Sequence, residues 1–270
     1  VAAAHYVTTK FPEVNSYTGI NQNYAWGQDS WRDFNLTMQN LKPGSKASAK
    51  LQFPKIFAGQ YGSEISALSL DKSDLVHSSF WDGDLESFIF QGAVRGLFKK
   101  KKVVFTDGGT ASYRLGKKMP DGIILGARGP YGVLVRDRKT ALNEWFIKAY
   151  KDRYGVFPSG PAYQYGQGVL AAKIAYDNAA KAAGGFPNQD QVMKALTGLK
   201  FESFSTNVDM ALAGGHQAIT EHVYGLSKYN ADTGEPGASD VVFFKGTCVM
   251  PPDGVKSVDW IKGGMKGAKC

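Results

Sequence analysis

The chain has 270 residues, of which 43% are hydrophobic and 21% are charged, and its formal net charge is +8. This composition excludes an intrinsically disordered chain, and no stretch approaches the ~20 apolar residues that span a bilayer. Lysine and arginine are scattered among acidic residues except in the run Lys99–Lys102. We expect that run to be a solvated loop, with a polyanion contact as the alternative, and we predict no nucleic-acid partner. The sequence begins at Val1, which indicates a processed or cut product.

The first part of the chain alternates between predicted helices and strands. Apolar residues at helical spacing (Trp31, Phe34, Met38 and Leu41) predict a helix that begins at Asp29. The other expected elements are helices at 2–10, 62–70 and 84–97, the last with Asp84 as N-cap, and strands at 16–21, 46–54, 74–80, 102–107 and 121–127. Alternation with short connections predicts an α/β fold in which helices cover both faces of a parallel sheet.

The middle of the chain is expected to be helical and its last part rich in strands. Helices are predicted at 141–154, 164–183 and 188–198, and strands at 218–230 and 240–246. Glycines in 127–132 and 213–218 predict two crossings of the chain between two lobes, because glycine permits the chain to change direction.

Aromatic and acidic residues follow three of the predicted strands. Tyr24 and Trp26 come after the first, Trp81 and Asp82 after a later one, and Asp107 after "KVVFT". Ligands of such sheets bind outside the carboxyl ends of the strands, so this pattern predicts a binding surface. The alternatives are that the tryptophans pack in the core and that Asp107 only begins a turn.

Familiar catalytic motifs are missing from the sequence. There is no HExxH, CxxC, Walker-type loop or GxSxG elbow, and the four histidines are far apart. His77 lies within a predicted strand and is expected in the core or behind the site. Asp82 and Asp84 are the best candidates for a catalytic carboxylate pair. If the protein were an enzyme, Asp82 or Asp107 would be its candidate base. We predict no enzyme, no metal and no cofactor.

Cys248 and Cys270 are the only two cysteines. Zinc would need about four ligands, and the nearest histidine in the sequence is His222, so a metal site is disfavoured. We expect a disulfide, which would indicate an oxidising compartment; two unrelated free thiols are the alternative.

The chain resembles the type I periplasmic solute-binding proteins of ABC transporters, in the branched-chain amino-acid and amide branch that includes Leu/Ile/Val-binding proteins. The motifs that carry the resemblance are NYAWGQD (23–29), SDLVHSSFWDGDLESFIFQGAVRGL (73–97), VVFTDGG (103–109), GARGPYG (126–132) and GHQAITEHVYGL (215–226). The resemblance implies two Rossmann-like lobes with parallel sheets. Residues 1–130 and 218–270 would form the second lobe, and residues 131–217 would be the remaining helical part of an incomplete first lobe.

The resemblance also implies a receptor, periplasmic or secreted and anchored at the cell surface, that delivers its ligand to an ABC permease. The ligand would be a small amino acid, an amide or a related polar organic molecule. By position, Trp26 and Trp81 match aromatic residues that face the ligand in the family. Asp107 matches the acidic residue that accepts the ligand's ammonium group, and Tyr163 matches an aromatic residue of the first lobe. Tyr24 is included because it is a neighbour of Trp26 in the sequence. An aromatic acid is the alternative ligand, and a ligand-sensing domain of a regulator is the alternative function.

Overall fold

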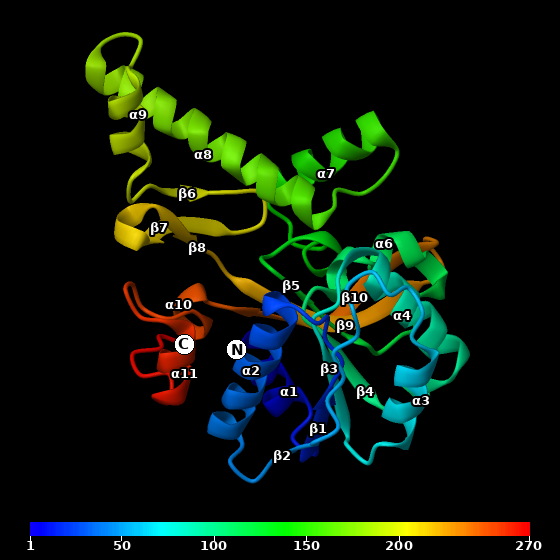
Figure 1. Ribbon diagram of the computed structural model, residues 1–270. Coiled ribbons are helices and arrows are strands. Elements are labelled where there is room, and N and C mark those ends of the chain that lie inside the picture. Colours follow the sequence, from blue (N-terminus) through cyan, green and yellow to red (C-terminus); the bar gives the residue numbers. More distant parts are fainter.

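A seven-stranded sheet forms the centre of the larger part of the molecule, in a computed structural model that describes residues 1–270 (Figure 1). We call this part the sheet part. The strand order is β10-β9-β5-β4-β3-β1-β2. The strands are β1 (Ser16–Gly19), β2 (Lys46–Ala47), β3 (Leu75–Ser78), β4 (Lys102–Phe105), β5 (Ile124–Ala127), β9 (His222–Asn230) and β10 (Glu235–Phe244). β1 to β5 pair in parallel, whereas β9 is antiparallel to both β5 and β10. The sheet is therefore mixed and mostly parallel, with an antiparallel hairpin at one edge.

Helices cover both faces of this sheet because successive strand residues point to opposite sides. In β4, Val103 and Phe105 belong to a core cluster of 24 buried residues, whereas Val104 belongs to a second cluster of 16. The first cluster packs under α3, α4 and α5, and the second under α1 and α2. The helices of this part are α1 (Ala2–Lys10), α2 (Ala25–Leu41), α3 (Gly62–Leu70), α4 (Asp82–Val94), α5 (Leu97–Lys100), α6 (Ser112–Leu115), α10 (Gly246–Val249) and α11 (Ser257–Lys262).

The smaller part, which we call the helical part, holds three helices and a small antiparallel sheet (Figure 1). Its elements are α7 (Ala141–Tyr154), α8 (Gly160–Ala183), α9 (Gln189–Leu196), β6 (Lys200–Glu202), β7 (Asn207–Leu212) and β8 (Gln217–Ile219). The helix ends follow local chemistry: Thr140 and Ser159 cap the starts of α7 and α8, and Gly155 and Gly184 end them in the left-handed conformation. β6 and β7 were not anticipated from the sequence.

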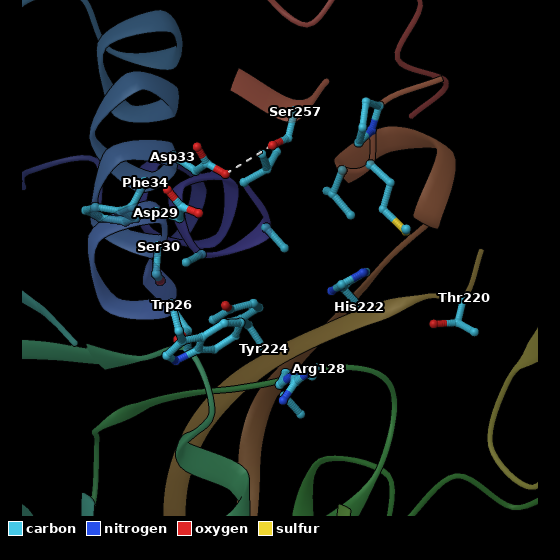
Figure 2. Close-up of a pocket in the computed structure, with 18 of the residues that line it drawn as sticks. Trp26, Asp29, Ser30, Asp33, Phe34, Arg128, Thr220, His222, Tyr224 and Ser257 are labelled. Carbon is cyan, nitrogen blue, oxygen red and sulfur yellow. Dashed lines mark hydrogen bonds between the residues drawn. The ribbon is translucent and has the colours of Figure 1, made fainter. Parts of the chain in front are cut away.

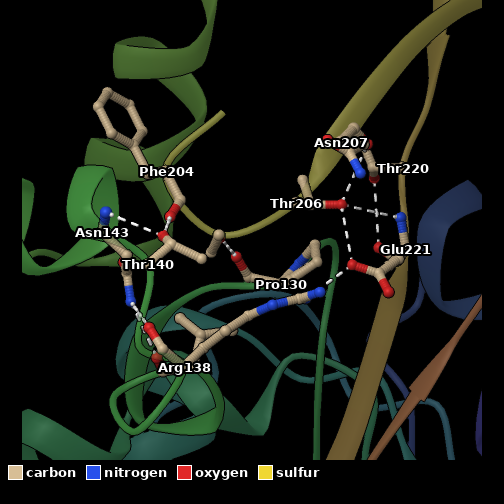
Figure 3. A network of polar contacts seen from close by, with 11 residues as sticks. Pro130, Arg138, Thr140, Asn143, Phe204, Thr206, Asn207, Thr220 and Glu221 are labelled. Carbon is tan, nitrogen blue, oxygen red and sulfur yellow. Dashed lines mark hydrogen bonds and ion pairs between the residues drawn. The ribbon is translucent and has the colours of Figure 1, made fainter. Parts of the chain in front are cut away.

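Polar contacts tie the two parts together where the chain passes between them (Figure 3). The Ser205 hydroxyl donates to the carbonyl of Pro130. Nη1 of Arg138 lies 2.6 Å from Oε2 of Glu221, and the Thr206 hydroxyl donates to the same oxygen at 3.2 Å. Pro130 and Arg138 lie on the outgoing connection and Glu221 on the returning one, so this network joins both connections to each other.

Several sequence predictions are confirmed and some need correction. The expected helices at 2–10, 62–70 and 141–154 have the predicted bounds. α2 begins at Ala25 and not at Asp29, because Tyr24 is already the extended N-cap residue. The strand expected at 46–54 is wrong for most of its length: only Lys46–Ala47 pairs as a strand, followed by one bridge between Ile20 and Gln52. This segment lies at the sheet edge and has a neighbour on one side only.

Asp84 is not the N-cap of α4, since the helix begins at Asp82 and Trp81 is its N-cap. Asp84 is instead buried, and its carboxylate accepts hydrogen bonds from the Gln22 side chain at 2.6 Å and the Phe57 backbone at 2.8 Å. Two donors from other segments hold it, so its role is to join three stretches of chain.

The lysine run is not a solvated loop. Lys99 and Lys100 end α5, the Lys101 ammonium donates to two backbone carbonyls, and Lys102 lies 3.3 Å from Glu13. Half of the run is therefore tied to neighbouring segments and does not form a free cationic patch. At the other end of the chain, Cys248 and Cys270 are joined in a disulfide, as expected.

Candidate functional site

A cavity of about 320 Å³ lies at the carboxyl ends of the parallel strands, between the sheet part and the start of α8. Its lining comes from both parts of the molecule. The lining residues are Tyr24, Trp26, Trp81, Asp107, Thr110, Arg128, Tyr131, Pro161 and Gln164. The structure thus brings four of the five predicted ligand-binding residues, Tyr24, Trp26, Trp81 and Asp107, to one cavity. We call it the head cavity.

Tyr163, the fifth predicted residue, does not reach this cavity. Its side chain is only 2% exposed, its hydroxyl donates to Oδ1 of Asn143 at 2.9 Å, and its ring packs edge-on against Phe146 at 4.9 Å. The side chain therefore belongs to the 24-residue core cluster, whereas Pro161 and Gln164, on another face of α8, line the cavity.

The aromatic residues stand at the rim because they occupy the starts of helices. Tyr24 and Trp81 are the N-cap residues of α2 and α4, with extended backbone, and Trp26 lies in the first turn of α2. Nε1 of Trp81 donates to the Tyr24 hydroxyl at 2.7 Å, and Nε1 of Trp26 donates to the Ser79 carbonyl at 2.9 Å. Both indole N–H groups are satisfied within the protein, which leaves ring faces for stacking.

Asp107 supplies a buried carboxylate that lacks a partner. It follows β4 and is 8% exposed, and its Oδ1 has no hydrogen bond. Burial raises the pKa of Asp107 to about 7, against the opposing effect of the Arg128 charge. A Cβ at the next residue, Gly108, would come within 2.7 Å of Leu125 Cδ2 and 2.9 Å of Phe105 Cβ. Glycine is therefore needed there for the chain to stay close against the sheet.

Arg128 is a site residue that sequence reasoning missed. Its guanidinium lies 4.9 Å from the centroid of the Trp26 ring, a cation–π distance, and its backbone N–H donates to the Tyr131 hydroxyl at 2.7 Å. Arg128 directly follows β5. The rule that pointed to Tyr24, Trp81 and Asp107, namely residues after parallel strands, could have found it.

The carboxylates considered for catalysis have other roles in the structure. Asp82 lies 2.7 Å from the Arg114 guanidinium, and Asp84 is held by its two structural donors. No group of three or more His, Cys, Asp or Glu side chains is arranged to hold a metal ion. The head cavity offers a carboxylate, a guanidinium and indole faces, which suit reversible binding of a small polar molecule.

A second cavity, of about 650 Å³, lies on the α1 and α2 side and shares Trp26 and Arg128 with the head cavity (Figure 2). His77 lines it with a fully buried ring that stacks on Phe34 at 4.4 Å. Burial lowers the pKa of His77 to about 3, so the imidazole is neutral. His77 is thus a core residue behind the site, as the sequence indicated.

The fold and the cavity define a class of protein: an α/β protein with a mostly parallel sheet, whose two parts line a cavity at the carboxyl ends of the strands. The chain belongs to the periplasmic binding protein family, whose sequence profile matches residues 1–232. This membership agrees with the predicted resemblance and with a protein that is not an enzyme. No curated protein sequence matches the chain, and none of its helices is long and apolar enough to cross a membrane.

Solved structures share this fold at low sequence identity. A solute-binding protein of an ABC transporter from Rhodopseudomonas palustris, in complex with 3,4-dihydroxy benzoic acid, superposes with a TM-score of 0.73 at 17% identity, covering 91% of this chain and 64% of that one. A leucine-binding protein from Thermotoga maritima gives 0.65 at 15% identity, with 89% and 64% covered. A leucine-, isoleucine-, valine-, threonine- and alanine-binding protein from Brucella ovis gives 0.69 at 18%, with 91% and 61% covered. The chain therefore spans less than two thirds of the length of these relatives.

Proposed function

We propose that the chain is the ligand-binding portion of a periplasmic receptor that captures a small amino acid, an amide or a related polar organic molecule and delivers it to an ABC permease. The observation that carries the proposal is the convergence of Trp26, Trp81 and Asp107, with Arg128, on one cavity of about 320 Å³ between two parts of the molecule. Residues 1–130 and 218–270 act as one lobe, and residues 131–217 belong to the other.

The charges in the head cavity match the two ends of an amino acid. The unpaired Asp107 carboxylate accepts the ammonium group, which gains a charge-assisted hydrogen bond. The exposed Arg128 guanidinium can reach toward the ligand carboxylate, which it would hold in a bidentate pair. The face of Trp81 covers the side chain of the ligand. The negative Asp107 and the positive Arg128 thus match the ammonium and carboxylate groups of an α-amino acid.

An aromatic acid is the second ligand class, and the pKa of Asp107 supports it. Burial raises the pKa of Asp107 to about 7, so its protonated form is accessible near neutral pH, and a protonated carboxyl does not repel an incoming carboxylate. The ring would stack on an indole face while its carboxylate pairs with Arg128. The relative in complex with 3,4-dihydroxy benzoic acid shows that this fold accommodates such ligands.

Release and capture need the two parts to move about their connections. The ion pair between Arg138 and Glu221 joins the two connections, and Thr206, between β6 and β7, donates to Glu221, so these contacts would support the hinge. The Cys248–Cys270 disulfide favours an oxidising compartment, and thus an exported receptor over a cytoplasmic sensor domain.

Isothermal titration of the chain with leucine and with para-hydroxybenzoate tests the proposal and separates the two ligand classes. Asp107→Asn should weaken leucine binding about tenfold or more, since it removes the ammonium acceptor, and should leave the affinity for para-hydroxybenzoate equal or higher. The matched control is Asp232→Asn, which changes an exposed carboxylate outside the cavity. Unchanged leucine affinity in Asp107→Asn would falsify the assigned role of Asp107, and failure of both ligands to bind would contradict the receptor function.

A further inference from the structure

A third cavity, of about 930 Å³, adjoins the head cavity. Four residues line both: Trp81, Asp107, Thr110 and Pro161. We call the larger space the tail cavity. Because the two share these four residues, a ligand seated against Trp81 and Asp107 meets both spaces at once. Neither the family resemblance nor the proposed function assigns a role to this second space.

The far wall of the tail cavity is aromatic and is built from both parts of the molecule. Tyr113 of α6 stacks on Phe157, which lies between α7 and α8, with ring centroids 4.7 Å apart and an interplanar angle of 9°. The Lys151 ammonium lies 4.0 Å from the centroid of the Phe157 ring. Val156 and Pro236 complete an apolar and aromatic lining. Such a surface favours a flat or aliphatic group that is removed from water.

Apart from Asp107, which the tail cavity shares with the head cavity, the charged side chains around the tail cavity are paired. Arg114 lies 2.7 Å from Asp82 and 2.5 Å from Glu86. Glu235 lies 3.2 Å from Arg136 and 3.3 Å from Lys151. Beyond Asp107, an incoming group therefore meets no unpaired charge here.

The head cavity has the opposite character. Oδ1 of Asp107 has no hydrogen-bond partner, and the Arg128 guanidinium lies over the Trp26 ring. Asp107 thus lies where the two cavities join, beside Trp81, whereas Arg128 lines only the head cavity and the Tyr113–Phe157 wall lines only the tail cavity. A binding site with a charged end and an apolar end fits a ligand with a charged end and an apolar end.

We propose that the head and tail cavities form one bipartite site for an amphiphilic small molecule. Its charged head, an ammonium or carboxylate group, lies between Asp107 and Arg128, and its neutral aromatic or long aliphatic tail extends past Trp81 to the Tyr113–Phe157 wall. The proposal rests on the proposed receptor function and deepens it: the ligand is larger than a simple branched-chain amino acid, and the tail cavity sets its length.

Two probes with the same head test this proposal by isothermal titration. Phenylalanine carries one ring, and biphenylalanine carries a second ring that the proposal places in the tail cavity. Biphenylalanine should bind at least about tenfold more tightly, which corresponds to about 1.4 kcal/mol. Val156→Trp should abolish that advantage, because Val156 lines the tail cavity and not the head cavity.

Val169→Trp is the matched control: Val169 is an exposed valine, on α8, that lines neither cavity. It should keep the advantage of the second ring. Val156 is itself 58% exposed, so a larger side chain does not disturb the core, and thermal unfolding of both variants checks that they fold. If phenylalanine binds and biphenylalanine binds no better in the unmutated chain, or if Val156→Trp keeps the advantage, the bipartite site is wrong while the receptor function stands. If neither probe binds, the receptor function fails as well.

Discussion

Replacing Asp107 with asparagine should stabilise the free protein at neutral and alkaline pH. In the folded state burial raises the pKa of this carboxyl from 3.8 to about 7. Between these two values the unfolded chain has lost the proton and the folded chain still holds it, so folding stability falls as the pH rises through this window. A difference of this size corresponds to about 4 kcal/mol, at 1.36 kcal/mol per pKa unit. Asparagine has the same shape and no charge to bury, so the stability of the variant does not fall in this pH window for this reason.

Urea unfolding of both proteins in steps from about pH 4 to about pH 8 measures the effect. The stability difference between variant and unmutated protein should be near zero at the acid end, grow in favour of Asp107→Asn, and level off above the folded pKa. Because other titrating groups are common to both proteins, their contributions cancel. Asp74→Asn is a control of opposite sign. Burial acts to raise the pKa of Asp74, but hydrogen bonds from Asn15 and Ser16 outweigh it and lower the pKa, so loss of this carboxylate should destabilise the protein above the usual aspartate range. A difference for Asp107→Asn that stays flat across this pH range would refute the reasoning.

Three further predictions concern the disulfide, the connections and the core. Cys248→Ser should lower the free energy of unfolding by about 2–4 kcal/mol, measured against the unmutated protein without reductant; the gap should close when reductant is added. Glu221→Gln should cost about 1–2 kcal/mol because it breaks the ion pair with Arg138, and a variant as stable as the parent would contradict that role. Tyr163→Phe should lower the free energy of unfolding by about 1–2 kcal/mol, because it removes the hydrogen bond to Asn143, and should leave ligand affinity unchanged. A lower affinity by titration would show that Tyr163 contributes to the binding site.

Much of the candidate site could be predicted from the sequence alone. In a parallel sheet every strand ends at the same edge, so residues that follow different strands must lie near one another. That rule is sufficient to bring Tyr24, Trp26, Trp81 and Asp107 to one rim, and the structure places all four around one cavity. Helix bounds such as 141–154 were equally readable, because an N-cap threonine and a C-terminal glycine act within one turn.

Other features were decided only by the tertiary structure, because they depend on what packs over a residue. Three such features arise from contacts between segments far apart in the chain. They are the burial of the Tyr163 side chain, the burial that raises the pKa of Asp107, and the position of the Arg128 guanidinium over the Trp26 ring. The tail cavity is a further case, since its wall joins Tyr113 to a ring from the other part of the molecule. The local sequence pattern determines which residues lie at the carboxyl edge of the sheet. Only the packing of the whole chain determines which of these side chains are buried and which remain accessible to a ligand.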